Sequence, residues 1–424
     1  MQPPPERSSD PLLATLALCW LFLALCLWQI AIPSRPYFDE VHYLPAARAL
    51  LDGSEWLNAE HPPLGKIILA AGIGLFGDTP LGWRILPALF GTIALFAFSR
   101  ALWEASRSRF AALAYCWLLG TGFFLIIHAR IAMLDVFMVA FMALCLWQCA
   151  RAVRAPEEGR KRLILAGLAL GAALATKWNA VPLAVVPGLA FLACRIGAGR
   201  RRLLLSRRGA PVPGVSLAEA ALWLGVLPLA VYALSYAPLL WIEGNPFGPR
   251  GFIGIQQMML EMQQSVKQPH PYQSNWQQWL LNLRAIWYFY EDFDGAWRGV
   301  MLLGNPLTML LGLPALLWCG WAAWKQRRGD ALAVAVLFGF SFGFWIVAAK
   351  PIQFYYHYFL PSCFLLAALA LALDELRQRG LAWFSYISLS ASAGLFVFFF
   401  PVLTAMRLKA SGSFVTWTWM ESWK

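Results

Sequence analysis

The sequence carries little charge for its length. Only 13% of its 424 residues are charged, whereas a soluble protein carries roughly 25%. With 60% hydrophobic residues, this deficit excludes an ordinary soluble domain and indicates an integral membrane protein. None of the eight cysteines forms a C-x-x-C pair, so neither a disulfide framework nor a zinc knuckle is supported. No A-x-A cleavage site follows the apolar run 11–32. Since that run exceeds the roughly 7–15 residues of a signal-peptide core, we interpret it as an uncleaved first span.

Apolar runs long enough to cross a membrane recur along the chain. A spanning helix needs about 20 mostly apolar residues, and this rule predicts an all-α membrane protein with about eleven transmembrane helices. The predicted limits are 11–32, 80–103, 109–127, 131–150, 161–176, 178–196, 217–241, 300–323, 331–349, 352–373 and 381–403. The run 66–77 is shorter, so we interpret it as interfacial or re-entrant.

Basic residues fix the expected orientation. Arginine and lysine cluster within 151–162, 195–208, 325–328 and 377–379, and all four clusters fall on one side of the predicted bundle. Short basic loops face the cytoplasm. The net charge of +12 is therefore a topology signal, with anionic lipid headgroups as partners. It gives no reason to predict a nucleic-acid partner.

Two long loops, 33–79 and 243–299, fall on the opposite, external side of a membrane domain that covers 1–403. The tail 404–424 is expected on the same side. Ionisable residues gather where the spans meet this side, and such residues usually mark function because a charge at the bilayer centre costs about 2.5–3.5 kcal/mol. They are Asp39, Glu40, Arg84, His128, Arg130, Asp135, Lys177, Lys350 and His357.

Each of these residues also has a purely structural interpretation. Arg84 and Lys177 would suit snorkelling side chains at span ends. Asp135 and Arg130 would suit a structural ion pair, and His357 a packed histidine. Several acids and cations at one depth, however, favour a shared anionic ligand and a shared reaction.

Eight short motifs, each weak alone, occur in the order found in one family. They are "FDEVHY", "HPPLGK", "WRILPALFG", "ARIAMLD", "TKWN", "HPYQSNW", "LLGNP" and "YYHYFLP", between about residues 36 and 365. With these motifs in this order, the chain resembles the protein O-mannosyltransferases. It is also similar to the wider class of polyprenyl-phosphate-sugar-dependent membrane glycosyltransferases with the GT-C fold.

The resemblance implies a GT-C bundle with juxtamembrane helices in the first external loop. It also implies a catalytic acidic pair, which matches Asp39 and Glu40, a functional arginine at Arg84 and an acid at Asp135. The outer loops leave no room for the large lumenal domain of eukaryotic members, so the acceptor stays open. The run "AEHPPLGK" also resembles the "EKPP" of lipid A aminoarabinose transferases, where the acid binds metal; Glu60 keeps that alternative open.

The residues suggest how such a reaction would run. Lys66, Arg84, Arg130 and Lys177 are the candidate cations for the donor phosphate. Asp39 is the candidate general base for the acceptor hydroxyl, with Glu40 orienting either Asp39 or the acceptor. Attack with one carboxylate as base inverts the anomeric centre. The candidate acceptor and sugar pocket comprises His61, His270, Tyr272, Trp276, Tyr356 and His357.

The sequence thus predicts a glycosyltransferase of a bacterial inner membrane with its catalytic loops on the periplasmic side. It would move a sugar, mannose by resemblance, from a polyprenyl or dolichyl phosphate to a protein serine or threonine. Transfer to lipid A or another glycan is the alternative, and a transporter or lipid flippase is the non-enzyme alternative. No cofactor is required, although Glu60, His61 and His270 are weak candidates for a divalent metal site.

Overall fold

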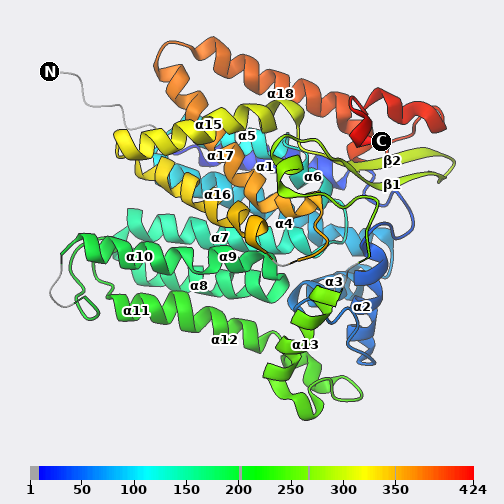
Figure 1. Cartoon of the computed structure of the whole chain (residues 1–424), viewed down its shortest axis with the longest axis horizontal. Coiled ribbons are helices and arrows are strands. Elements are labelled where there is room, and N and C mark those ends of the chain that lie inside the picture. The colour runs from blue at the N-terminus through cyan, green and yellow to red at the C-terminus, as the bar shows by residue number, and fades with distance from the viewer. Residues whose placement is uncertain (1–8, 200–202, 266–267, 349) are drawn as a thin grey trace.

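The computed structural model describes residues 9–199, 203–265, 268–348 and 350–424. Long helices run side by side and form one bundle (Figure 1). In this part of the chain, eight helical segments are long and apolar enough to cross a membrane. They are Pro80–Ser106 (α4), Leu134–Arg154 (α7), Trp178–Gly197 (η2, α9, α10), Leu217–Trp241 (α11, η3, α12, η4), Pro306–Lys325 (α15), Gly329–Val347 (α16), Tyr355–Gln378 (η6, α17) and Ala382–Leu403 (α18).

Shorter helices fill the remaining predicted spans. Leu12–Leu27 (α1) and Arg109–Gly120 (α5) are apolar but fall below spanning length, and Gly159–Thr176 (α8) begins with three basic residues. Each of the eleven predicted ranges contains helix, which confirms the all-α membrane fold. The count of eleven spans is not confirmed, because only eight segments of the described residues meet the criterion of length and composition.

The first long loop contains the two juxtamembrane helices that were expected, Glu40–Asp52 (α2) and Leu64–Phe76 (α3). Helix α2 ends at Gly53, whose φ of 65° is the left-handed conformation that glycine supplies at helix C-termini. The other short elements are Phe124–His128 (α6), Pro156–Glu158 (η1), Gly248–Arg250 (η5), Gly251–Ser265 (α13), Trp276–Leu280 (α14), Ser411–Thr416 (η7) and Glu421–Trp423 (η8).

A β-hairpin interrupts the second long loop and was not predicted. Strands Ile286–Phe293 (β1) and Ala296–Leu302 (β2) pair antiparallel around Asp294 and Gly295, whose φ angles are both positive. An Asp-Gly turn of this kind is the strongest short-range hairpin signal. The predicted span 300–323 was therefore wrong at its start: residues 300–302 belong to β2, and α15 begins at Pro306.

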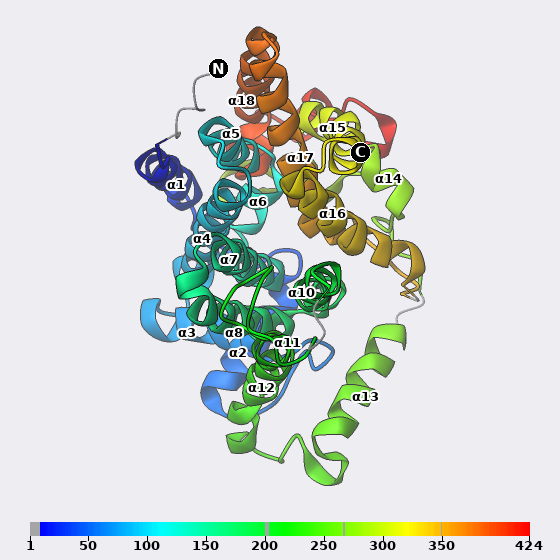
Figure 2. The same cartoon turned by 90° about the vertical axis from the view of Figure 1, so that its left-hand side faces the viewer.

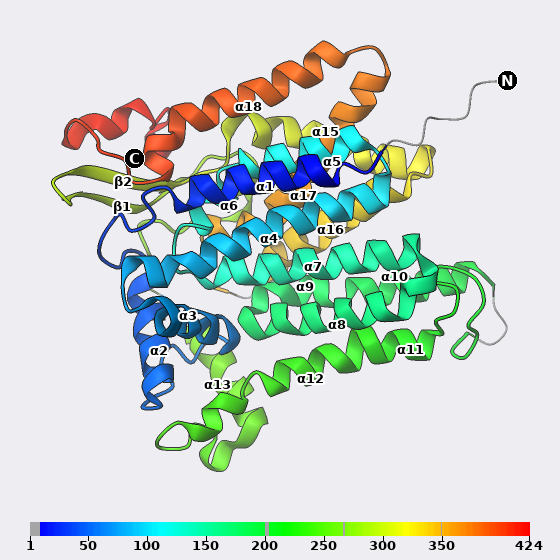
Figure 3. The same ribbon diagram turned by 180° about the vertical axis from the view of Figure 1, so that it is seen from behind.

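Helices α2 and α3, the hairpin and the tail gather at one end of the bundle (Figures 1 and 3). We call it the site end, because Asp39 precedes α2 there. The loops that join α7 to α8, α10 to α11, α15 to α16 and α17 to α18 lie at the other end (Figure 1). These are the loops of the basic clusters, of which Arg200, Arg201 and Arg202 lie outside the described residues. Seen end-on, α7 lies between α4 and α8, and α13 stands apart from the bundle (Figure 2).

Small residues let the helices of the core approach one another closely, as is usual in membranes. A Cβ atom at Gly91 of α4 would lie 2.5 Å from the Cβ of Ala129, and one at Gly65 of α3 would lie 2.8 Å from Leu134. Residues Leu134 to Ala140, at the start of α7, are all buried. This packing fixes the N-terminus of α7, and with it Asp135, at the site end.

Candidate active site

The carboxylate of Asp39 is half-buried and lacks a bonded partner. Asp39 precedes the first turn of α2, and its backbone carbonyl accepts hydrogen bonds from the amides of His42 and Tyr43. No hydrogen bond or ion pair of its side chain occurs within the described residues. Burial raises the pKa of this carboxyl to about 6; the Asp135 carboxylate acts in the same direction, and Lys177 opposes it. A free carboxylate with a pKa close to neutral suits a general base.

The neighbouring acid, Glu40, is fully engaged. Its two oxygens accept the Nε and Nη2 hydrogens of Arg84, both at 2.8 Å, and both side chains are completely buried. The amides of Ala132 and Tyr37 also donate to this carboxylate. Glu40 therefore joins α2, α4 and the turn before α7, while the adjacent Asp39 stays unbonded.

Arg84 likewise has no donor left for a ligand. Besides Glu40, its guanidinium donates to the carbonyls of Ile30, Pro33 and Arg35, at 3.1, 2.7 and 3.1 Å. The predicted phosphate contact of Arg84 gains no support from this arrangement. Arg84 instead fastens the segment that leads to Asp39 onto α4.

Asp135 and Lys177 form the second buried ion pair of the site end. The Nζ of Lys177 lies 2.6 Å from the Oδ2 of Asp135, and both side chains are almost fully buried. Asp135 lies in the first turn of α7 and Lys177 at the C-terminus of α8, the ends at which helix dipoles favour these charges. The alternative pairing of Asp135 with Arg130 is not observed.

Lys350 and His357 lie beside this pair. The Nζ of Lys350 is 3.4 Å from Nε2 of His357. Burial lowers the pKa of Lys350 to about 8; nearby Lys177 lowers it further, while the carboxylates of Asp135 and Asp39 oppose this. The charges of Asp135 and Lys177 thus lie close enough to both Asp39 and Lys350 to shift the pKa values of these two groups.

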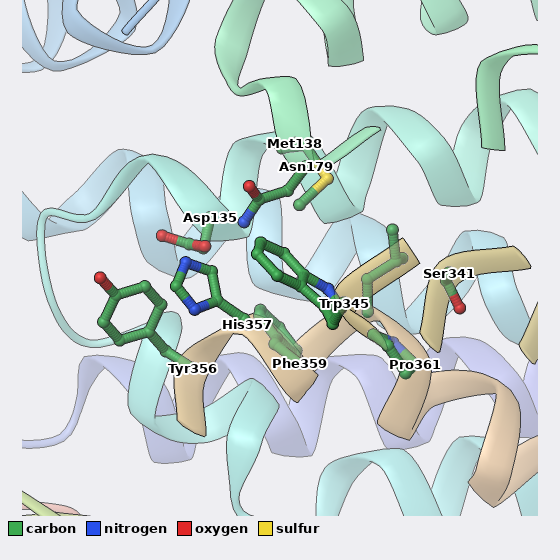
Figure 4. A pocket seen from close by; sticks show the side chains of 10 residues that line it. Asp135, Met138, Asn179, Ser341, Trp345, Tyr356, His357, Phe359 and Pro361 are labelled. Carbon is green, nitrogen blue, oxygen red and sulfur yellow. The ribbon is translucent and has the colours of Figure 1, made fainter. Parts of the chain in front are cut away.

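A small cavity lies beside Asp135 and His357 (Figure 4). Asp135, Asn179, Trp345, Tyr356 and His357 line it, and its volume of about 10 Å³ is roughly the space one water needs. A second cavity of about 450 Å³ shares Trp345 with it and reaches Lys350. Its other walls come from Gln273, Ser274, Asn275, Trp276, Gln278, Ile346, Pro351 and Gln353.

Two other predicted phosphate cations are bonded to backbone carbonyls. The Nζ of Lys66 donates to the carbonyls of Leu57, Asn58 and His61, at 3.3, 2.6 and 3.0 Å, which uses its three hydrogens. Arg130 donates to carbonyls at the C-terminus of α1, including Cys26 at 2.6 Å, and to Thr404 after α18. A buried cation at helix C-termini satisfies carbonyls that the helices leave unpaired. Neither side chain is aimed at a ligand.

The candidate metal ligands do not assemble. Glu60 accepts a hydrogen bond from Asn58, His61 packs against Tyr43, and exposed His270 packs its ring against Phe354. Across the described ranges, no three His, Cys, Asp or Glu side chains are placed to hold a metal ion together. A metal requirement stays an untested prediction, without a site built from these three residues.

The predicted pocket residues divide between the two cavities and their surroundings. Tyr356 and His357 line the small cavity and Trp276 the large one. The Tyr356 ring also lies 5.1 Å from the Nζ of Lys177. His61, His270 and Tyr272 line neither cavity.

Two family models match consecutive parts of the chain. Residues 60–224 match the model described as dolichyl-phosphate-mannose-protein mannosyltransferase, and residues 249–423 match the C-terminal four-transmembrane region of protein-O-mannosyltransferase. The chain belongs to the protein O-mannosyltransferase family. It is accordingly a glycosyltransferase, as its sequence motifs predicted.

Curated members of the protein O-mannosyltransferase family align over nearly the whole chain. The polyprenol-phosphate-mannose–protein mannosyltransferase of Mycolicibacterium smegmatis is 28% identical over 92% of this chain and 88% of its own. The protein of the same name from Mycobacterium tuberculosis is 26% identical over 94% of this chain and 89% of its own. The alignments therefore cover most of the length of these relatives as well as of this chain.

Solved structures confirm the GT-C fold of this family member. The Saccharomyces cerevisiae Pmt1–Pmt2 complex bound to the sugar donor superposes with a TM-score of 0.82, at 14% identity, over 97% of this chain and 92% of that one. ArnT from Cupriavidus metallidurans bound to undecaprenyl phosphate gives a TM-score of 0.57, at 16% identity, over 91% of this chain and 64% of that one.

Asn179 and Tyr288 were missing from the predicted residues of this candidate site, and Lys350 was named among its ionisable residues without a role. Asn179 lines the small cavity and Lys350 the large one. Both stand beside predicted motifs, Asn179 inside "TKWN" and Lys350 before "YYHYFLP". Tyr288 approaches from β1, and the Asp-Gly turn of its hairpin is the sequence signal that locates it.

Proposed function

We propose that this chain transfers a mannosyl group from a polyprenyl phosphate to a serine or threonine hydroxyl of a protein, on the periplasmic side of a bacterial inner membrane. One observation carries the proposal: an unbonded carboxylate, Asp39, stands among buried cations at the end of the bundle opposite the basic loops. A lipid-borne donor suits this position, because its tail would lie in the membrane and its phosphate at the interface. Cytosolic nucleotide sugars do not reach that side.

Lys177 and Lys350 are the proposed ligands of the donor phosphate. The ammonium group of Lys177 lies close enough to lower the pKa of Lys350, and an anionic group between the two lysines relieves that repulsion. Preorganised cations stabilise the phosphate best as it leaves with growing negative charge. Asp135 holds Lys177 in place through the 2.6 Å ion pair.

Asp39 is the proposed general base. It takes the proton of the acceptor hydroxyl as that oxygen bonds to the anomeric carbon. The bond between the anomeric carbon and the phosphate oxygen breaks at the same time, and polyprenyl phosphate leaves. A single displacement of this kind inverts the anomeric centre. Glu40 and Arg84 take no part in the bond changes; they hold Asp39 in position.

The 450 Å³ cavity is the proposed approach for the acceptor. Its lining of amide side chains, Trp276 and Trp345 offers hydrogen-bonding groups and aromatic faces to an extended polypeptide. Lys350, which lies next to His357, is one of its lining residues. Substituting Trp276 with alanine is expected to raise the KM for the peptide several-fold and to leave the KM for the donor unchanged, as measured by varying each substrate separately.

Purified protein in lipid nanodiscs tests the proposal. Polyprenyl-phosphate mannose is supplied with either a serine- and threonine-rich peptide or lipid A, and products are identified by mass spectrometry and proton NMR. The expected product is a mannosyl peptide whose anomeric configuration is opposite to that of the donor. Transfer to lipid A alone would favour the glycolipid alternative, and no transfer to either acceptor would contradict the proposed function.

The rate should depend on pH in a bell shape. Asp39 must be ionised, so kcat/KM rises as the pH rises through about 6. Lys350 must be protonated, so kcat/KM falls as the pH rises through about 8. Lys350→Arg should move the alkaline limb to higher pH, because a guanidinium stays charged there. A flat profile between pH 5 and 9, with chemistry rate-limiting, would contradict these two assignments.

A further inference from the structure

The β1–β2 hairpin contacts the segment that leads to Asp39 in an ordered way. Ser34 hydrogen-bonds Asp294 through its hydroxyl, at 2.6 Å, and Arg35 pairs with Glu291. Tyr37 packs its ring against Phe289, with centroids 5.8 Å apart, and Phe38 stacks on Tyr288. Residue numbers thus rise along the segment 34–38 while those of its partners fall from 294 to 288. The contacts lead from the turn of the hairpin to the candidate active site.

The innermost contact, between Phe38 and Tyr288, is the closer of the two ring contacts. Their ring centroids lie 3.8 Å apart and their planes differ by 18°. Phe38 directly precedes Asp39 and has a φ of 50°, a left-handed conformation that non-glycine residues rarely adopt without support from their surroundings. Tyr288 covers one face of the Phe38 ring.

A β-bulge brings Tyr288 to this place. In the ladder, Trp287 pairs with Met301 and Phe289 with Val300, so Tyr288 is an extra residue of β1 without a partner of its own. Bulges of this kind occur beside active sites, where they redirect a side chain. The Tyr288 ring is buried, and its hydroxyl lies 3.4 Å from Nε2 of His128.

The tail holds the hairpin from its other side. The indole of Trp287 donates to the carbonyl of Trp423 at 3.0 Å, and the indole of Trp423 donates to the carbonyl of Asn282 at 2.9 Å. Tyr290 lies nearer the turn and packs its ring on Phe414, with centroids 5.5 Å apart. The bonds through Trp287 and Trp423, directly beside Tyr288, are the ones that hold β1 at the bulge.

We infer that Tyr288 is a positioning residue of the transfer reaction: its ring holds Phe38 in the left-handed conformation and thereby aims the Asp39 carboxylate at the acceptor hydroxyl. The inference rests on the proposed role of Asp39 as the base. It predicts that the ring of Tyr288 matters and that its hydroxyl does not. Asp39 would keep its surroundings of Lys177, Asp135, His42 and Lys350 only while the stack is intact.

Four variants test it: Tyr288→Ala, Tyr288→Phe, Phe38→Ala and the double alanine variant, with Tyr290→Ala as the matched control. Tyr290→Ala removes an equal ring from the same strand without touching Phe38. Tyr288→Ala should lower kcat about 10- to 100-fold, the scale of a small misplacement of a catalytic group, with the donor KM unchanged. Tyr288→Phe should restore most of the rate. Phe38→Ala and the double variant should lose as much as Tyr288→Ala and no more.

A second readout does not need transfer. Water-soluble carbodiimide reacts with protonated carboxyls, and the pH midpoint of its coupling to Asp39 can be followed by mass spectrometry of the peptide. Tyr288→Ala and Phe38→Ala should shift that midpoint equally, and Tyr290→Ala should not shift it. If Tyr288→Ala lowers thermal stability as Tyr290→Ala does, but preserves both kcat and the midpoint, the inference is overturned. If wild-type protein transfers no sugar, the proposed function fails, and the midpoints still decide whether the stack positions Asp39.

Discussion

Replacing Asp39 with asparagine is expected to lower kcat by about 10²- to 10⁴-fold, the usual contribution of a positioned general base. Asparagine keeps the size of the side chain but accepts no proton. Because the Asp39 carboxylate bonds to no other described residue, the substitution breaks no ion pair, and the folded state should keep its stability. Single-turnover transfer from polyprenyl-phosphate mannose measures the loss, and donor binding measured separately should be unchanged.

Asp78→Asn is the matched control for this experiment. Asp78 is also an acid of the first long loop, but it pairs with Arg48 at the surface, 2.7 Å away and half exposed. Its removal should leave kcat within about twofold of wild type, since surface ion pairs contribute little. An Asp39→Asn variant that turns over as fast as Asp78→Asn would remove Asp39 from the mechanism.

Replacing Arg84 with alanine is expected to destabilise the protein by about 3–5 kcal/mol, the cost of leaving one partner of a buried ion pair uncompensated. The substitution leaves the Glu40 carboxylate buried and deprives the carbonyls of Ile30, Pro33 and Arg35 of their donor. Thermal unfolding in detergent, followed by intrinsic tryptophan fluorescence, measures the effect. Activity should fall because the segment before Asp39 loosens.

Arg48→Ala provides the comparison, since it breaks an exposed pair and should cost less than about 1 kcal/mol. The sequence-based hypothesis for Arg84 makes the opposite forecast. A phosphate ligand would lose donor affinity on substitution and leave the unfolding midpoint in place. That pattern would contradict the structural role assigned here and restore Arg84 to the donor site.

The adjacent acids show what the sequence could and could not predict. Motif order and span parity predicted Asp39 and Glu40 as site residues, because ionisable residues at the level of a membrane usually mark function. Which of the two acids forms an ion pair and which stays unbonded depends on Arg84, which lies 44 positions from Glu40 in the sequence. No local sequence pattern shows that Arg84 pairs with Glu40 and not with Asp39.

The cations were harder to assign for a related reason. A lysine or arginine at the end of an apolar segment looks the same in the sequence whether it faces a lipid phosphate or a helix C-terminus. Lys66, Arg84 and Arg130 proved to be bonded to protein acceptors. Only Lys177, among the four predicted cations, lies beside the unbonded acid. The hairpin, in contrast, carried a readable signal in its Asp-Gly turn between aromatic-rich runs.

The most direct test of the central claim is an experimental structure of the protein with a polyprenyl-phosphonate mannose analogue and a serine peptide. The phosphonate is expected within about 4 Å of the ammonium groups of Lys177 and Lys350, the distance of an ion pair. The serine hydroxyl is expected about 2.6–3.2 Å from the Asp39 carboxylate. A phosphonate bound away from both lysines, or an Asp39 side chain that turns away from the peptide, would contradict the central claim.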